Sequence, residues 1–112
     1  MRHWAEELAR DYLAGRGYEL LAENYPVRGG EIDLIMRQGK ETVFVEVRQR
    51  SSDSYGGPGE SLDARKLALI RRAARVYLVR QFGRDDLPVR LDAVLVHGNR
   101  RKYRVEHLMG IG

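Results

Sequence analysis

Acidic residues occur inside strongly apolar runs of this sequence, and they are the residues best placed to do chemistry. Glu46 stands within Val43–Val47, and Asp33 and Asp92 lie in similar runs. Apolar residues at consecutive positions indicate a strand that is covered on both faces. An unpaired charge buried in such a strand costs on the order of several kcal/mol. Each of these carboxylates therefore needs a positive partner.

The alternation of side chains along strands predicts that Asp33 and Glu46 meet. The runs 31–37 and 42–48 read as two strands of a hairpin. A turn centred on residues 38–39 sets Asp33 diagonal to Glu46, and a turn one residue later pairs them directly. Either register places both carboxylates on one face with their Cβ atoms about 5–8 Å apart. A bulged three-residue turn would break this parity.

Two carboxylates so close together cannot both stay ionised in a low-dielectric site without a counter-charge. One candidate is a divalent metal ion, and hard oxygen ligands in a chain without Cys favour Mg²⁺ or Mn²⁺ over Zn²⁺. The other candidate is an ion pair with Arg48 or Arg90. The spacing alone leaves both alternatives open.

Two helices and five strands are expected to position these residues, in the order α-β-β-β-α-β-β. The helices are expected at Arg2–Ala14 and about Leu62–Phe82, and glycine follows each of them. Ser61 is the expected N-cap of the second helix, where Asp63 suits the helix dipole. The strands are expected at Tyr18–Val27, Glu31–Arg37, Thr42–Arg48, Val89–His97 and Lys102–Leu108. This order favours an α/β fold in which helices cover a mixed sheet.

Length and composition narrow the classes of protein. The 112 residues suit a single domain, 1–112, and the absence of Cys excludes thiolate nucleophiles, iron–sulfur ligation and disulfides. No apolar run approaches the roughly 20 residues that span a bilayer, and the N-terminus does not resemble a signal peptide. We therefore expect a soluble cytoplasmic protein with no membrane partner.

Arginine supplies 17 of the 20 basic residues, although the net charge is only +4. One explanation is genome composition. The other is a surface for nucleic acid, since guanidinium groups bind phosphate bidentately and stack on bases.

The central motifs resemble those of a known family. Gly30–Ile35 (GEIDLI) and Phe44–Arg50 (FVEVRQR) resemble the GEIDLI and FVEVKxR signatures of the YraN family, small bacterial proteins usually labelled endonucleases. The likeness covers nearly the whole chain. It includes a GExxA-like segment at Glu6, a Lys at position 66 and an RFD-like strand at Arg90–Asp92.

The resemblance implies a restriction-endonuclease-like core, similar to archaeal Holliday-junction resolvases and other PD-(D/E)xK nucleases. Asp33 then matches the motif Asp and Glu46 the Glu of Glu-x-Lys, while Glu6 matches an extra acidic metal ligand of some resolvases. The implied activity is Mg²⁺- or Mn²⁺-dependent phosphodiester hydrolysis, with branched or structured DNA as the substrate. Resolvases of this kind act as dimers, so the resemblance also points to a possible homodimer.

Arg48 departs from the family pattern, which has Lys at this position. Arg cannot act as a base, although it can hold a phosphate and offset transition-state charge. The alternative function is therefore a DNA- or RNA-binding module with weakened or lost turnover. Lys66 falls on the apolar arc of the second helix, where it either extends out to solvent or reaches Asp33 and Glu46 and replaces the missing lysine. That arc is formed by Leu67, Ile70, Ala73, Ala74, Tyr77 and Leu78.

Nucleic-acid contacts are expected on two further segments. The Gly- and Ser-rich stretch 49–60 reads as a loop, in which Arg50 and Tyr55 could follow a phosphate backbone or simply belong to a connector. Arg65 and Arg72 lie on the polar face of the second helix, which is either a solvated surface or a nucleic-acid footprint. A third hypothesis is structural: Asp33 and Glu46 form ion pairs with Arg48 and Arg90, and the domain serves protein–protein contacts. The three His residues show no metal-ligand spacing and are expected to be incidental.

Overall fold

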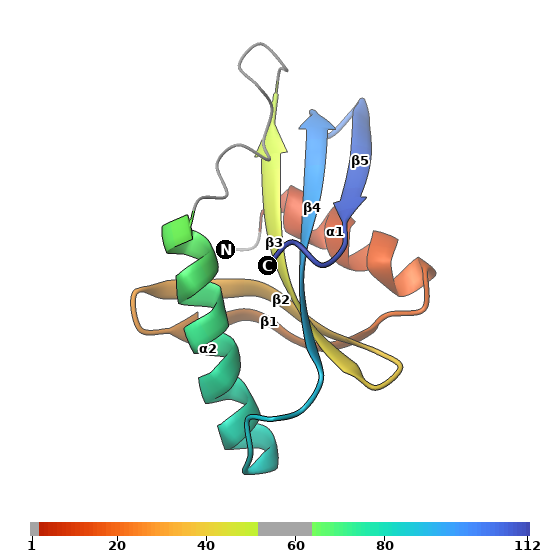
Figure 1. Cartoon of the computed structure of the whole chain (residues 1–112). Helices are drawn as coiled ribbons and strands as arrows, with labels where there is room; N and C mark the ends of the chain where they lie inside the picture. Colours follow the sequence, from red (N-terminus) through yellow and green to blue (C-terminus); the bar gives the residue numbers. More distant parts are fainter. Residues whose placement is uncertain (1–2, 52–63) are drawn as a thin grey trace.

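A single five-stranded sheet forms the centre of the protein, with one helix packed on each side (Figure 1). The computed structural model describes residues 3–51 and 64–112. The elements in chain order are α1 (Trp4–Gly15), β1 (Glu19–Val27), β2 (Gly30–Gln38), β3 (Glu41–Arg50), α2 (Ala64–Phe82), β4 (Val89–Gly98) and β5 (Tyr103–Leu108). The expected order and the mixed α/β class are confirmed.

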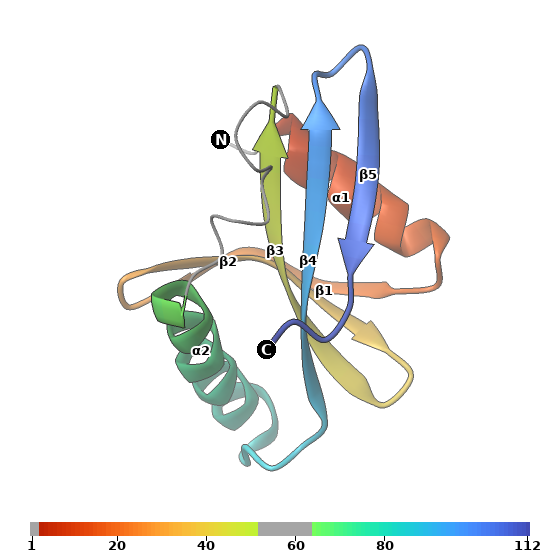
Figure 2. The ribbon, with the colours of Figure 1, turned by 45° about the horizontal axis from the view of Figure 1, so that its top comes forward.

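The strands lie in the sheet in sequence order, β1-β2-β3-β4-β5. Only β3 and β4 run parallel, joined by the crossover through α2, whereas the other neighbours are antiparallel. Consecutive buried residues in Thr42–Glu46 confirm that β3 is covered on both faces. The sheet is twisted, so that the β1–β2 hairpin crosses the direction of β3 and β4 (Figure 2).

β3 is longer than expected. The composition predicts that the loop begins at residue 49, but the parallel ladder continues to Arg50 opposite His97. The side chain of Gln49 also donates to the carbonyl of Gly98 at 2.7 Å. Pairing with β4 therefore overrides the polar composition of this segment, and the rest of the expected loop lies outside the described residues.

Each helix buries the stripe that its periodicity predicts. In α1 the buried residues are Ala5, Ala9 and Leu13, one per turn. His3 is not incidental, because its Nδ1 accepts from the backbone N–H of Ala5 at 3.1 Å and caps the helix. The expected arc of α2 is confirmed at Ile70, Ala73, Ala74, Tyr77 and Leu78. Its expected cap, Ser61, and its first residues lie outside the described part.

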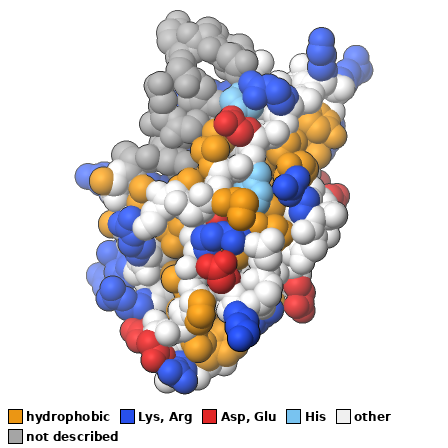
Figure 3. Space-filling view, turned by 45° about the vertical axis from the view of Figure 1, so that its right-hand side comes forward, with side chains coloured by type: hydrophobic (Ala, Val, Ile, Leu, Met, Phe, Trp, Pro, Cys, Tyr) orange, Lys and Arg blue, Asp and Glu red, His pale blue; other side chains and the backbone are white. Residues whose placement is uncertain are grey.

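The molecular surface mixes charged and apolar side chains over the face in Figure 3. Neither of the helices in the described residues is long and apolar enough to cross a membrane.

Candidate functional site

The β2–β3 hairpin brings Asp33 and Glu46 together. Its last pair is Gln38 with Glu41, which corresponds to the turn centred on residues 39–40. The ladder is paired as far as Leu34 and Val45, and one further step sets Asp33 opposite Glu46. There the side chain of Asp33 accepts the backbone N–H of Val47 at 2.8 Å. The carboxylate of Asp33 is thus fixed at the point where the two strands part.

Two further carboxylates join Asp33. Oxygen atoms of Glu6, Glu31 and Asp33 all lie within 4.8 Å of one another, so the start of α1 and the start of β2 meet here. Asn24 bridges the cluster, since its Nδ2 donates to Glu6 at 2.7 Å and to Glu31 at 3.3 Å. Glu31 was not among the expected site residues, although its position two residues before Asp33 on the same strand face is a signal for it.

Burial and a neighbouring carboxyl group both raise the pKa of Asp33. Burial, then a hydrogen bond and repulsion from the carboxyl group of Glu46, raise the pKa of Asp33 to about 7. The N–H of Val47 and the charge of Lys66 act in the opposite direction and do not offset this. The surroundings of Asp33 therefore favour its protonated form more than water does.

Glu46 faces two cations. Lys66, in the first turn of α2, places its Nζ 3.3 Å from Oε2 of Glu46, so it reaches the site rather than solvent. A guanidinium nitrogen of Arg48 lies 3.8 Å from Oε1, beyond hydrogen-bond length. The Lys66 contact is within ion-pair distance but lacks hydrogen-bond geometry, and among the described residues Glu46 Oε2 and Arg48 Nε have no hydrogen-bond partner. The buried carboxylate of Glu46 is thus only partly satisfied.

Arg90 and Asp92 form a separate centre. Arg90 was one candidate partner for the acidic pair, but its guanidinium binds Asp92 at 2.8 Å and also contacts Glu41 and Tyr18. His107 holds the other oxygen of Asp92 at 2.8 Å, so this histidine is structural rather than incidental. Within the described ranges, no arginine pairs with Asp33.

A hollow of about 260 Å³ opens beside the acidic cluster, between the start of α1 and the end of β3. Its lining includes Glu6 and Arg48, which gives a ligand an approach to these two site residues. Of the residues expected to bind nucleic acid, Arg50 ends β3 and is partly exposed, and Arg65 is exposed at the start of α2. Tyr55 lies outside the described residues.

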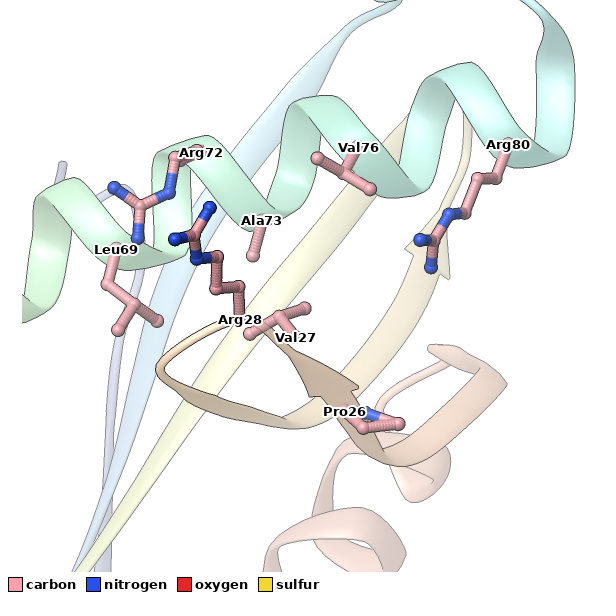
Figure 4. Close-up of a pocket in the computed structure, with 8 residues that line it drawn as sticks. All are labelled: Pro26, Val27, Arg28, Leu69, Arg72, Ala73, Val76 and Arg80. Carbon is pink, nitrogen blue, oxygen red and sulfur yellow. The ribbon is translucent and has the colours of Figure 1, made fainter.

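Arg72 lies at a different hollow, of about 380 Å³, between α2 and the β1–β2 hairpin (Figure 4). Arg28 lines the same hollow, and Figure 4 shows Arg80 toward its other end along α2. The floor is apolar and is formed by Pro26, Val27, Leu69, Ala73 and Val76. The structure therefore does not bring Arg72 into the acidic cluster.

Comparison with known proteins identifies the family. The model of the uncharacterised protein family UPF0102 matches residues 5–96. A UPF0102 protein of Thermus thermophilus is 47% identical over 106 residues, which cover 95% of this chain and 91% of the relative. One from Nitrosomonas europaea is 50% identical over 96 residues (86% and 80%), and one from Halorhodospira halophila is 50% identical over 104 residues (91% and 85%). The chain belongs to the UPF0102 family.

Proposed function

We propose that this protein is a metal-dependent endonuclease that hydrolyses phosphodiester bonds in nucleic acid, with DNA as the substrate. The observation that carries the proposal is the meeting of Glu6, Glu31 and Asp33 beside Glu46 and its lysine partner. Three carboxylate oxygens within 4.8 Å of one another suit a hard divalent cation. The resemblance to the PD-(D/E)xK nucleases supports the same assignment.

The electrostatics of Asp33 and Glu46 also suit the binding of Mg²⁺ or Mn²⁺. Burial and the neighbouring carboxyl group of Glu46 raise the pKa of Asp33, and the charge of Lys66 does not offset them. Glu46 also keeps a buried oxygen without a hydrogen-bond donor among the described residues. Asp33, Glu46 and Glu6 are the proposed ligands, and Glu31 is added to them.

The chain's own residues have distinct roles in this proposal. A bound divalent cation polarises a phosphate and lowers the pKa of water. Lys66, held against Glu46, supplies the positive charge for the phosphoryl oxygens that the motif lysine supplies in related nucleases. Arg48 holds a phosphate oxygen through its fork of N–H donors. Arg48 thus binds, while Lys66 contributes to the chemical step.

A second candidate is a nucleic-acid-binding module without turnover, and Arg48 at the motif position favours it. The test is cleavage of duplex, single-stranded and four-way DNA with and without Mn²⁺. Mn²⁺-dependent products support the endonuclease. Binding of any of these DNAs without products supports the module, and neither binding nor cleavage contradicts both.

Metal affinity is expected to depend on pH through Asp33. Because its pKa is about 7, a cation must displace a proton at lower pH. Mn²⁺ affinity measured by calorimetry should fall about tenfold per pH unit below that pKa and level off above it. Asp33→Ala should bind Mn²⁺ at least about tenfold more weakly at pH 8. Mutation of a residue that merely supports a metal ligand typically lowers metal affinity by about 10–100-fold, and loss of a ligand should cost no less. Glu19→Ala, an exposed acid outside the cluster, is the control and should match the wild type.

Lys66→Ala is expected to lower the rate of cleavage much more than the affinity for DNA. Loss of one preorganised charge at the reacting phosphate costs about 10²–10³ in the cleavage rate. DNA affinity, which depends on many phosphate contacts, should change only a few-fold. Lys66→Arg should restore part of the rate if charge alone is needed. Cleavage by Lys66→Ala at the wild-type rate would show that Lys66 does not replace the motif lysine.

A further inference from the structure

The turn that connects β4 and β5 is a concentrated patch of positive charge outside the acidic site. Residues 99–104 are all exposed, and four of these six are basic: Arg100, Arg101, Lys102 and Arg104. No acidic residue occurs in the sequence between Asp92 and Glu106. Basic side chains extend from the top of the face shown in Figure 3, over this end of β4 and β5.

Hydrogen bonds hold the backbone of this turn in one conformation. The side chain of Asn99 accepts the backbone N–H groups of Arg101 at 2.9 Å and Lys102 at 3.0 Å. The backbone N–H of Asn99 donates to the carbonyl of Lys102 at 2.9 Å. Gly98 has a φ of +119°, and a Cβ there would lie 2.3 Å from the carbonyl oxygen of Lys102. The backbone therefore presents the basic residues in a fixed arrangement.

The parallel pairing of β3 and β4 sets the position of the turn relative to the site. Glu46 is level with Ala93, and the ladder continues to Arg50 and His97. The turn begins at Asn99, six residues beyond Ala93, which at about 3.3 Å per residue is some 20 Å along the strand direction. Figures 1 and 2 both show β3 and β4 ending at this side of the sheet. Double-helical nucleic acid rises about 3.4 Å per base pair, so this distance corresponds to about six base pairs.

We propose that this basic turn, residues 99–104 including the first two residues of β5, binds the phosphate backbone of a nucleic-acid duplex about six base pairs from the acidic site. The inference rests on the proposed function and specifies its substrate: a duplex arm long enough to reach from the site to the turn. Adjacent guanidinium groups fit phosphate because each donates two parallel N–H bonds. A backbone contact of this kind fixes the position of the duplex and does not read its sequence.

The test removes the charge of the turn and compares it with an equal change elsewhere. The variant is Arg100→Gln/Arg101→Gln/Lys102→Gln. The control is Arg16→Gln/Lys40→Gln/Arg84→Gln, which alters exposed residues after α1, before β3 and after α2. Binding of fluorescent duplexes is measured by anisotropy in EDTA, so that no cleavage occurs, and circular dichroism verifies the fold of each variant.

The turn variant should bind a 20-base-pair duplex about 10–100-fold more weakly at low salt than the wild type. The slope of log affinity against log salt should become shallower by about two to three, because each lost phosphate contact removes about 0.9. The control should lose less affinity and keep more of the slope. In a series of shortened duplexes, wild-type affinity should drop when the arm no longer spans the site and the turn, and the turn variant should not show this drop.

The outcomes separate the inference from the proposed function. If the wild type binds duplex and the turn variant matches it in affinity and slope, the inference is wrong and the proposed function stands. If the wild type binds neither duplex nor four-way DNA, both are wrong. If the turn variant loses binding to vesicles that contain phosphatidylserine while duplex binding is unchanged, the turn serves an anionic lipid surface and the inference is wrong.

Discussion

Replacing Asp33 with Asn should abolish metal-dependent cleavage and at the same time stabilise the protein at pH 8. Asn keeps an oxygen that can accept the N–H of Val47, and its amide can donate to Glu46. The substitution thus removes a negative charge from a crowded site without removing its hydrogen bonds. Loss of a metal ligand worth several kcal/mol in the transition state lowers the rate by about 10³ or more.

The pH dependence of the stability follows from the direction of the shift. Burial and Glu46 raise the pKa of Asp33 to about 7, so the folded protein keeps this proton where the unfolded chain has released it. The stability that this group contributes is complete below the unfolded carboxyl pKa of about 4 and is lost as the pH rises through about 7. The wild type therefore loses stability across this window, and the Asn variant does not.

Urea unfolding in EDTA at pH 5 and pH 8 measures this difference. We expect a gain on the order of 1–3 kcal/mol for Asp33→Asn at pH 8 and a much smaller one at pH 5. Glu19→Gln is the matched control, since Glu19 is exposed and lies outside the cluster. A variant that is destabilised equally at both pH values, or that still cleaves, would contradict the assignment of Asp33.

The pairing of Asp33 with Glu46 could be predicted because strand parity is strict. A side chain cannot change faces without a bulge, and the β2–β3 turn contains none between residues 34 and 45. Both open registers predict the same face, and the structure has the one with its turn at residues 39–40, whose paired ladder ends at Leu34 and Val45, one step before Asp33 and Glu46. Glu31 follows from the same rule. The contribution of Glu6 was implied by the family resemblance alone, since periodicity says nothing about where a helix begins in space.

Contacts between elements far apart in the chain could not be predicted in this way. Whether Lys66 turns inward depends on how α2 packs on the sheet, which one sequence does not specify. The extension of β3 to Arg50 depends on a parallel partner almost 50 residues away, a tertiary effect that overrides local composition. The role of His107 depends likewise on the place of β5 beside β4.

Asp92 shows how a buried acid can be structural rather than catalytic. Arg90 donates to its two oxygens at 2.8 and 3.0 Å, His107 contacts it at 2.8 Å, and the N–H of Gly110 donates at 3.1 Å. Burial by itself raises the pKa of Asp92, but these hydrogen bonds outweigh it and hold the pKa below its ordinary value. These partners favour the ionised form of Asp92, whereas burial and Glu46 favour the protonated form of Asp33.

Asp92→Ala should be the most destabilising substitution, with a loss of about 3–5 kcal/mol, because it leaves the guanidinium of Arg90 without its buried partner. Urea unfolding at pH 7 measures the loss, and the difference from the wild type should shrink as the pH falls below the ordinary carboxyl range, where Asp92 becomes protonated. Asp86→Ala, which removes an exposed partner of Arg84, is the control and should leave the midpoint unchanged. If Asp92→Ala unfolds at the wild-type midpoint, the network does not stabilise the fold. If it folds normally but loses Mn²⁺ affinity, Asp92 belongs to the metal centre and the separation of the two acidic centres is wrong.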